Sequence, residues 1–180
     1  KLEYVHENVI NNLGTDWNLE HNVATTLKFI KKAKRPIFLA GNGIRLSNQQ
    51  DSYLKVLSNM KIPSVTGWNA HDLLPNNHPS YSGKPGTVGD RPGNFAIRSA
   101  DLVIVLGCRL NIRQISYNWD SFAPEAKIIM VDIDKYELKK HTLKINRKFH
   151  PFQNGIIFRV IKNDIYISNH QQVILINLND

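Results

Sequence analysis

Unbroken apolar runs mark the predicted strands of this chain. Leu102–Leu106 and Ile128–Val131 contain no polar residue. Because they lack the alternation of a half-buried strand, these runs are typical of parallel strands covered by helices on both faces. We expect two further strands at Ile37–Ala40 and at Ile62–Thr66. The pattern therefore predicts a parallel sheet as the centre of the molecule.

Between these runs, apolar residues recur at the three- and four-residue spacing of helices. The spacing predicts a helix from about residue 19 to residue 33, which ends before Pro36, and a second helix capped by Ser47. A short helix is expected at 93–99, and another follows the last strand. This order of strands and helices predicts an α/β fold with a doubly wound sheet and helices on both faces.

The pattern divides the chain into three parts. Residues 1–18 are polar and poorly periodic, so we interpret them as a linker or the remnant of an upstream domain. Residues 19–145 carry the α/β alternation and form the predicted domain. Residues 146–180 contain two strand-like runs without helical spacing. We expect this atypical tail to pack poorly or to supply irregular strands.

Glycine and charged residues follow the predicted strands, at the edge where open parallel sheets bind ligands. Gly41–Gly43 could bring backbone close to a phosphate, or could form only a tight turn. Arg109 and Arg113 are four residues apart and could hold a diphosphate between two guanidinium groups. Of Asp132 and Asp134, one could reach a ribose hydroxyl, or both could be solvated.

The long predicted loop at 67–92 is rich in Gly, Pro, Asn and His. Loops of this length inside a compact domain often carry function. Its last part and the residues after it, 83–94, are dense in glycine and lead into the short helix, which Asp90 or Asn94 could cap. Free N–H groups in this stretch could meet a phosphate or the edge of a flavin. Ordinary turn chemistry explains the same residues equally well.

The net charge of +8 and the pI near 9.6 raise the question of nucleic-acid binding. The basic residues form two groups, near 28–35 and near 135–148, without interleaved aromatic residues. Lysines at a helix end also complement the helix dipole, so the pattern argues against a nucleic-acid partner.

Other functional classes find little support in the composition. No apolar run is long enough to cross a membrane. The only cysteine, Cys108, allows no internal disulfide, so we expect a reducing cytoplasm and a buried thiol without a nucleophilic role. The seven histidines are scattered without metal-ligand spacing, so no metal site is predicted.

Four segments together resemble the central domain of thiamine-diphosphate-dependent enzymes, in particular the acetolactate-synthase-like group. They are RPIFLAGNG, IPSVTG, GDRPGNFAIRSADLVIVLGCRLNIRQ and FAPEAKIIMVDID. The resemblance covers about residues 22–144 and keeps the order and spacing of the family's motifs. It implies a six-stranded Rossmann-like fold of the sirtuin/DHS-like type, within a lyase or transferase.

The resemblance also implies a site for FAD or ADP across the strand ends. Departures from the family pattern are Asn42 in place of a glycine, Lys84-Pro85 in place of Met-His, and Asn111-Ile112 in place of two acidic residues. The positions that the resemblance assigns to the site run from the diphosphate, past the flavin side, to the adenosine end. They are Gly41, Asn42, Gly43, Thr66, Gly67, Gly86, Thr87, Gly107, Arg109, Arg113, Asp132 and Asp134.

In complete enzymes of this family, thiamine diphosphate and magnesium are held by a first domain and by a third domain with a Gly-Asp-Gly…Asn motif. No segment of this sequence matches either domain. We therefore expect an isolated or truncated central domain, with no catalytic residue and no carboligase activity of its own. Its expected partners are the missing thiamine-binding domains, in the same gene or on a separate chain, and a homo-oligomer is also open.

Two alternatives belong to other functional classes. One is a standalone nucleotide-binding enzyme or subunit with a sirtuin-like or electron-transfer-flavoprotein-like fold. A single cysteine excludes the zinc ribbon of a sirtuin. The other is an interaction module that supports a separately encoded partner.

Overall fold

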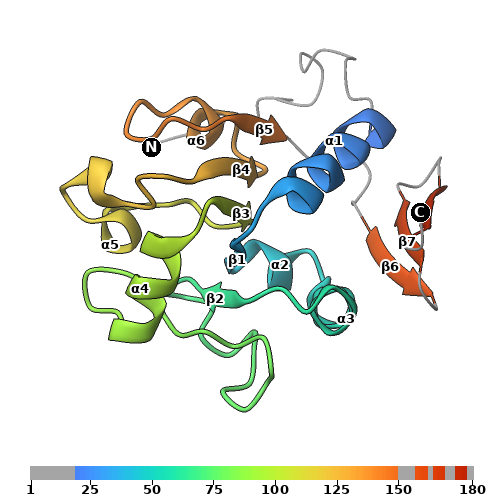
Figure 1. Cartoon of the computed structure of the whole chain (residues 1–180), viewed down its shortest axis with the longest axis horizontal. Coiled ribbons are helices and arrows are strands. Elements are labelled where there is room, and N and C mark those ends of the chain that lie inside the picture. Colours follow the sequence, from blue (N-terminus) through green and yellow to red (C-terminus); the bar gives the residue numbers. More distant parts are fainter. Residues whose placement is uncertain (1–18, 150–156, 162–163, 169–172, 178–180) are drawn as a thin grey trace, which may run out of the picture.

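A computed structural model describes residues 19–149, 157–161, 164–168 and 173–177 (Figure 1). The helices are α1 (Leu19–Lys32), α2 (Gly43–Leu46), α3 (Gln50–Met60), α4 (Arg91–Ser99), α5 (Ile112–Ile115), the 3-10 helix η2 (Trp119–Ser121) and α6 (Lys135–Lys139). The strands are β1 (Pro36–Ala40), β2 (Ser64–Thr66), β3 (Leu102–Leu106), β4 (Lys127–Val131), β5 (Arg147–Phe149), β6 (Ile157–Ile161), β7 (Asp164–Ser168) and β8 (Val173–Asn177).

Five parallel strands form the central sheet in the order β2-β1-β3-β4-β5. β1 pairs with β3 along its whole length, from Pro36 opposite Leu102 to Ala40 opposite Leu106. The chain leaves β1 toward β2 on one side and later returns to β3 on the other. The strand order therefore reverses between β1 and β3, which makes their carboxyl ends the topological switch point of the sheet.

Helices cover both faces of the sheet, as the apolar runs predicted. Ile37 and Leu39 pack on the face covered by α4, α5 and α6, while Phe38 and Ala40 pack on the face covered by α1, α2 and α3. In Figure 1, α1 and α3 lie on one side of the strands and α4 and α5 on the other. Burial of one such leucine or isoleucine side chain contributes about 1.5–3 kcal/mol. The fold is the predicted α/β, Rossmann-like arrangement.

The second predicted helix is α3, and Ser47 does not cap its start; the short helix α2 before Ser47 was not expected. Ser47 follows α2, and its hydroxyl donates back to the carbonyl oxygen of Ile44 at 3.0 Å. Asn48 then has φ 55°, which breaks the helix before α3 begins at Gln50. Gln49 occupies the cap position of α3, so Ser47 lies two residues before the position from which a side chain caps this helix.

The short helix before β3 starts two residues earlier than predicted, at Arg91. Of the two candidate caps, Asp90 is the one used: its carboxylate accepts from the N–H of Gly93 at 2.7 Å. α5 and η2 were not expected from the pattern, because four- and three-residue helices are too short to show a period.

The segment after residue 145 begins with a strand of the central sheet. β5 pairs in parallel with β4, with Val131 opposite Phe149. The central sheet of the described residues therefore has five strands, where the resemblance implied six. β6, β7 and β8 form a separate antiparallel sheet in that order. Two of its strands match the strand-like runs of the sequence, and β7 was not expected.

Within the described residues, no helix is long and apolar enough to cross a membrane.

Candidate functional site

Three glycines bring the carboxyl ends of β1 and β3 into direct backbone contact. The N–H of Gly43 donates to the carbonyl oxygen of Gly107 at 3.0 Å, and the N–H of Gly41 donates to that of Leu106 at 2.9 Å. A Cβ on Gly41 would lie 2.2 Å from the Gly107 oxygen. These two amides are thus already bonded within the protein. The close turn requires the glycines, whatever ligand the edge binds.

Asn42, between the two glycines of the turn, is held by the helix that follows it. Its side-chain oxygen accepts a hydrogen bond from Arg45, which also forms an ion pair with Asp72 at 2.5 Å. Asn42 precedes α2 as its cap residue but makes no side-chain capping bond. The Arg45 side chain therefore joins α2 to the loop after β2.

The end of β2 carries a buried hydroxyl without a partner. Thr66 is fully buried, and its Oγ1 has no hydrogen bond within the described residues. Gly67 follows, with its N–H bonded to the carbonyl oxygen of Ala40 at 2.8 Å, so the strand end stays tied to β1. Trp68 comes next and is 49% exposed. An unbonded buried hydroxyl costs roughly 1–3 kcal/mol, which makes Thr66 a feature that a bound group could satisfy.

The glycine-dense loop folds onto α5. Gly86 has φ +143°, and a Cβ there would lie 2.7 Å from the carbonyl oxygen of Arg113. The same oxygen accepts hydrogen bonds from the N–H of Thr87 at 2.8 Å and from its hydroxyl at 3.2 Å. The buried amide of Gln114 donates to the carbonyl oxygen of Pro85 at 2.7 Å. Gly86 and Thr87 are therefore fixed beside Arg113.

The two candidate arginines reach toward opposite flanks of the site. The Arg109 guanidinium forms an ion pair with Glu137 of α6, with 2.6 Å between Nη2 and Oε1. Lys140 binds the other oxygen of Glu137 at 2.6 Å. The Arg113 guanidinium instead lies 5.6 Å from the ring centroid of Trp68. The pair therefore does not converge on one point, as a shared grip on a diphosphate requires.

Glu137 is the centre of a charged cluster that also includes Arg109 and Lys140. Burial raises its pKa, but the hydrogen bonds and positive charges of Lys140 and Arg109 outweigh that effect and hold the pKa below its usual range. Its side chain is 16% exposed. The carboxylate is therefore ionised at neutral pH and ties the end of β3 to α6.

The two aspartates after β4 form the start of α6. β4 ends at Val131, so the alternation expected for a continuing strand does not apply to them. Asp132 is buried, and its carboxylate accepts from the N–H of Asp134 at 2.9 Å. Asp134 caps α6 by accepting from the N–H of Tyr136 at 2.8 Å. Burial raises the pKa of Asp132 above its ordinary value.

Cys108 is buried at the end of β3, and burial raises its pKa to about 11. A thiol with this pKa is protonated at neutral pH and is a poor nucleophile. The described part of the chain contains no group of three or more His, Cys, Asp or Glu residues that could hold a metal ion.

Residue patterns alone missed Trp68 and the partners of Arg109. Trp68 directly follows Gly67 at a predicted strand end, which is the signal that could have identified it. Glu137 and Lys140 are three residues apart and follow a capping aspartate, a spacing that puts their side chains close together.

Comparison with known proteins gives the family of this fold. Residues 23–148 match the family described as thiamine pyrophosphate enzyme, central domain. The chain is 38% identical to a probable acetolactate synthase large subunit of Methanococcus aeolicus, over 82% of this chain and 24% of that protein. It is 36% identical to the acetolactate synthase isozyme 1 large subunit of Escherichia coli, over 67% of this chain and 21% of that protein.

A probable acetolactate synthase large subunit of Methanocaldococcus jannaschii is 36% identical, over 63% of this chain and 19% of its own length. The chain thus spans 19–24% of the length of these relatives. The matched residues begin within α1 and end within β5, so they include the whole switch point. This chain belongs to the thiamine pyrophosphate enzymes, and it contains the central domain of that family.

Proposed function

We propose that this chain is the nucleotide-holding scaffold of an acetolactate-synthase-like enzyme of the cytoplasm. It binds FAD or ADP at the carboxyl edge of its sheet and performs no carboligation unaided. The observation that carries this proposal is the switch point between β1 and β3, bordered by Gly41, Gly43 and Gly107. Open α/β sheets bind nucleotides at such points.

The residues around this edge fit a nucleotide in part. Thr66 offers a buried hydroxyl that has no described partner. Arg113 forms no ion pair with a described carboxylate, and it lies over the half-exposed ring of Trp68. Together they can receive one anionic group and one planar ring. Arg109 would contact the ligand only if its guanidinium left the Glu137 carboxylate and bound a phosphate instead.

Asp132 and the amides of the glycine turn are already bonded, so we assign them to the frame of the site. In this proposal, Asp132 and the glycine amides hold the strand ends in position, while Arg113, Trp68 and Thr66 contact the ligand. This chain supplies binding and orientation. In complete enzymes of the family, thiamine diphosphate with magnesium supplies the reactive carbanion. We propose that the polypeptide carrying those thiamine-binding domains is the functional partner, and we assign no catalytic residue to this chain.

Titration calorimetry on the whole chain tests the proposal, with FAD, ADP and thiamine diphosphate plus magnesium as separate ligands. We expect heat of binding for FAD or ADP and none for thiamine diphosphate. Arg113→Ala should cost about 1.5–3 kcal/mol of binding free energy, the range of a charged hydrogen bond. Arg98→Ala, an exposed arginine on α4, is the control and should change nothing. Binding of thiamine diphosphate, or no response to either nucleotide, would contradict the proposal.

A further inference from the structure

A cluster of positive side chains lies at the opposite edge of the sheet from the nucleotide site. Lys31, Lys32 and Lys34 belong to the end of α1 and the turn after it, and all three are exposed. Lys127 and Arg147 are the exposed first residues of β4 and β5. Because parallel strands begin at one edge and end at the other, this basic surface is remote in topology from the switch point.

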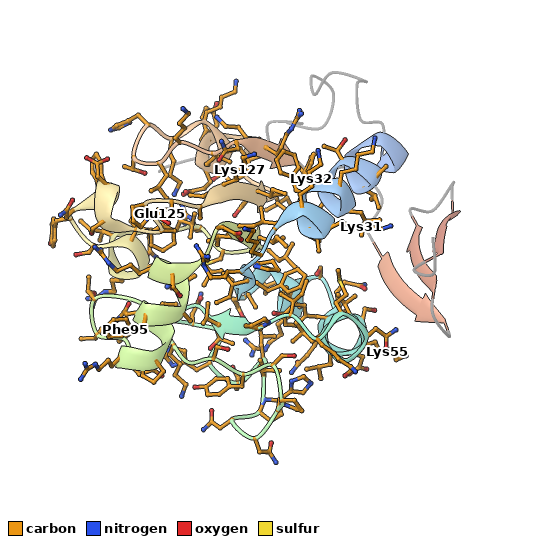
Figure 2. The ribbon with its side chains drawn as sticks, viewed as in Figure 1. Lys31, Lys32, Lys55, Phe95, Glu125 and Lys127 are labelled. Carbon is orange, nitrogen blue, oxygen red and sulfur yellow. The ribbon has the colours of Figure 1, made fainter. Side chains whose placement is uncertain are left out.

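The side chain of Phe29 joins these elements. The Lys127 Nζ lies 5.3 Å from the Phe29 ring centroid, and the Arg147 guanidinium lies 6.0 Å from it. Figure 2 shows Lys32 and Lys127 near each other on the upper side of α1, with Lys31 on the lower side of the same helix. Positive side chains from a helix and two strands are therefore held on one surface.

The surface has little internal compensation. Within the described residues, none of Lys31, Lys32, Lys127 and Arg147 forms an ion pair with a carboxylate. Asp101 accepts from the backbone N–H groups of Lys34 and Arg35 at 2.7 and 2.9 Å, and Glu125 pairs with Arg35 at 3.8 Å. The helix dipole accounts for Lys31 and Lys32 but not for cations at the start of two strands.

We propose that this basic surface binds an acidic polypeptide segment. Uncompensated like charges repel one another, and a partner with several carboxylates removes that repulsion while steering its own approach. A single-stranded nucleic acid fits less well, because binding without sequence preference uses aromatic rings as stacking platforms. The ring available here, Phe29, is only partly exposed and is covered by Lys127 and Arg147.

Fluorescence anisotropy of the whole chain with a labelled oligoglutamate peptide tests this inference. The test variant is Lys32→Glu with Lys127→Glu, the two lysines that lie near each other in Figure 2. The matched control is Lys55→Glu in α3 with Lys61→Glu at the residue that follows this helix, which changes the net charge equally. Figure 2 shows Lys55 away from Lys32 and Lys127. We expect the test variant to weaken binding at least about tenfold, and the control by much less. Circular dichroism confirms that both variants are folded.

Three results would overturn the inference. The first is no binding of oligoglutamate at low ionic strength. The second is equal loss of affinity in the two variants, since that indicates net charge instead of a localised surface. The third is tighter binding of an oligothymidine of the same charge at the same salt concentration, which would assign the surface to nucleic acid. None of these depends on whether FAD or ADP binds at the other edge.

Discussion

At the scale of single residues, the strand ends at the carboxyl edge of the sheet pack so closely that some positions have no space for a Cβ atom. Gly41 packs its Cα against the backbone of Gly107 and Cys108, and Gly43 against that of Gly107. At Gly67, one strand away, an added Cβ would lie 3.1 Å from the Cys108 Sγ, 3.4 Å from the Gln114 Oε1 and 3.5 Å from the Ala40 carbonyl oxygen, so its nearest neighbours are side-chain atoms. Glycines with the same place in the sequence pattern therefore differ in how strictly the fold requires them.

Alanine at these positions should separate the two situations. Gly41→Ala forces a Cβ to within 2.5 Å of the Cys108 Cα, so we expect a loss of about 2–4 kcal/mol in the free energy of unfolding. Gly67→Ala displaces a side chain instead of backbone and should cost less than about 1.5 kcal/mol. Urea unfolding measures both. Equal costs would show that the β1 and β3 ends can move apart.

Asp132 gives a pH-dependent prediction at the same scale. Its folded-state pKa is raised by burial, so the ionised carboxylate opposes folding. The stability contributed by the protonated group is complete below the unfolded pKa and is lost as the pH rises through the folded value. Asp132→Asn keeps an oxygen acceptor for the N–H of Asp134 and should be at least as stable as the native chain at pH 7.

Below pH 3 the advantage of Asp132→Asn should vanish, because the native carboxyl is then protonated in both states. Thermal unfolding across this range is the measurement. A variant that is less stable at pH 7 and unchanged in acid would mean that the Asp132 charge stabilises the fold.

At the scale of elements, one carboxylate sets the geometry of the loop before α4. Asp90 caps α4 through the N–H of Gly93, and it also accepts from the N–H of Lys84 at 3.0 Å. It thus ties the start of the glycine-dense loop to its end. Gly86 and Thr87 lie between these points, which explains how a loop without regular structure is held against α5.

Removal of this cap should be costly. Asp90→Ala leaves two amides without acceptors, so we expect a loss of about 1–3 kcal/mol in the free energy of unfolding. Asp51→Ala is the matched control, because Asp51 lies in the first turn of α3, is exposed and makes no capping bond. A cost for Asp90→Ala no larger than the control would show that the loop is fixed by its contacts with α5 alone.

At the scale of the whole molecule, the parallel sheet and the last strands are built on different principles. The family match ends at residue 148, one residue before the end of β5. Within the described residues, β6, β7 and β8 pair only with one another, and each pair is antiparallel. The described core residues on the two faces of the parallel sheet all lie between Phe29 and Phe149, and β6 lies beside α3.

Deletion of residues 150–180 should therefore leave a domain that unfolds cooperatively. Strands with unpaired edges favour self-association, so the shortened chain should also stay monomeric to a higher concentration. Calorimetric unfolding and sedimentation measure the two properties. Loss of cooperative unfolding on deletion would show that the last three strands belong to the core.

The sequence alone determined the fold class, and it predicted the edge of the sheet at which we propose that a ligand binds. Uninterrupted apolar runs specify strands buried on both faces, and such strands require helices on each side. Motif order also identified the family, since glycines and charged residues at strand ends keep a fixed spacing. The helix bounds were predicted less well: Ser47 does not cap α3, because α2 and the turn at Asn48 put Gln49 at the cap position instead.

Only the tertiary structure decided which of the candidate residues already have a partner within the protein and which remain able to contact a ligand. Arg109 and Arg113 are equivalent by spacing, yet Glu137, 28 residues after Arg109, engages one and Trp68 lies beneath the other. The amides of Gly41 and Gly43 donate hydrogen bonds to carbonyl oxygens at the end of β3, which is distant in sequence. Such partners come from pairing between separate strands and helices. Their identity depends on the three-dimensional arrangement of elements and not on the local pattern that predicts each element.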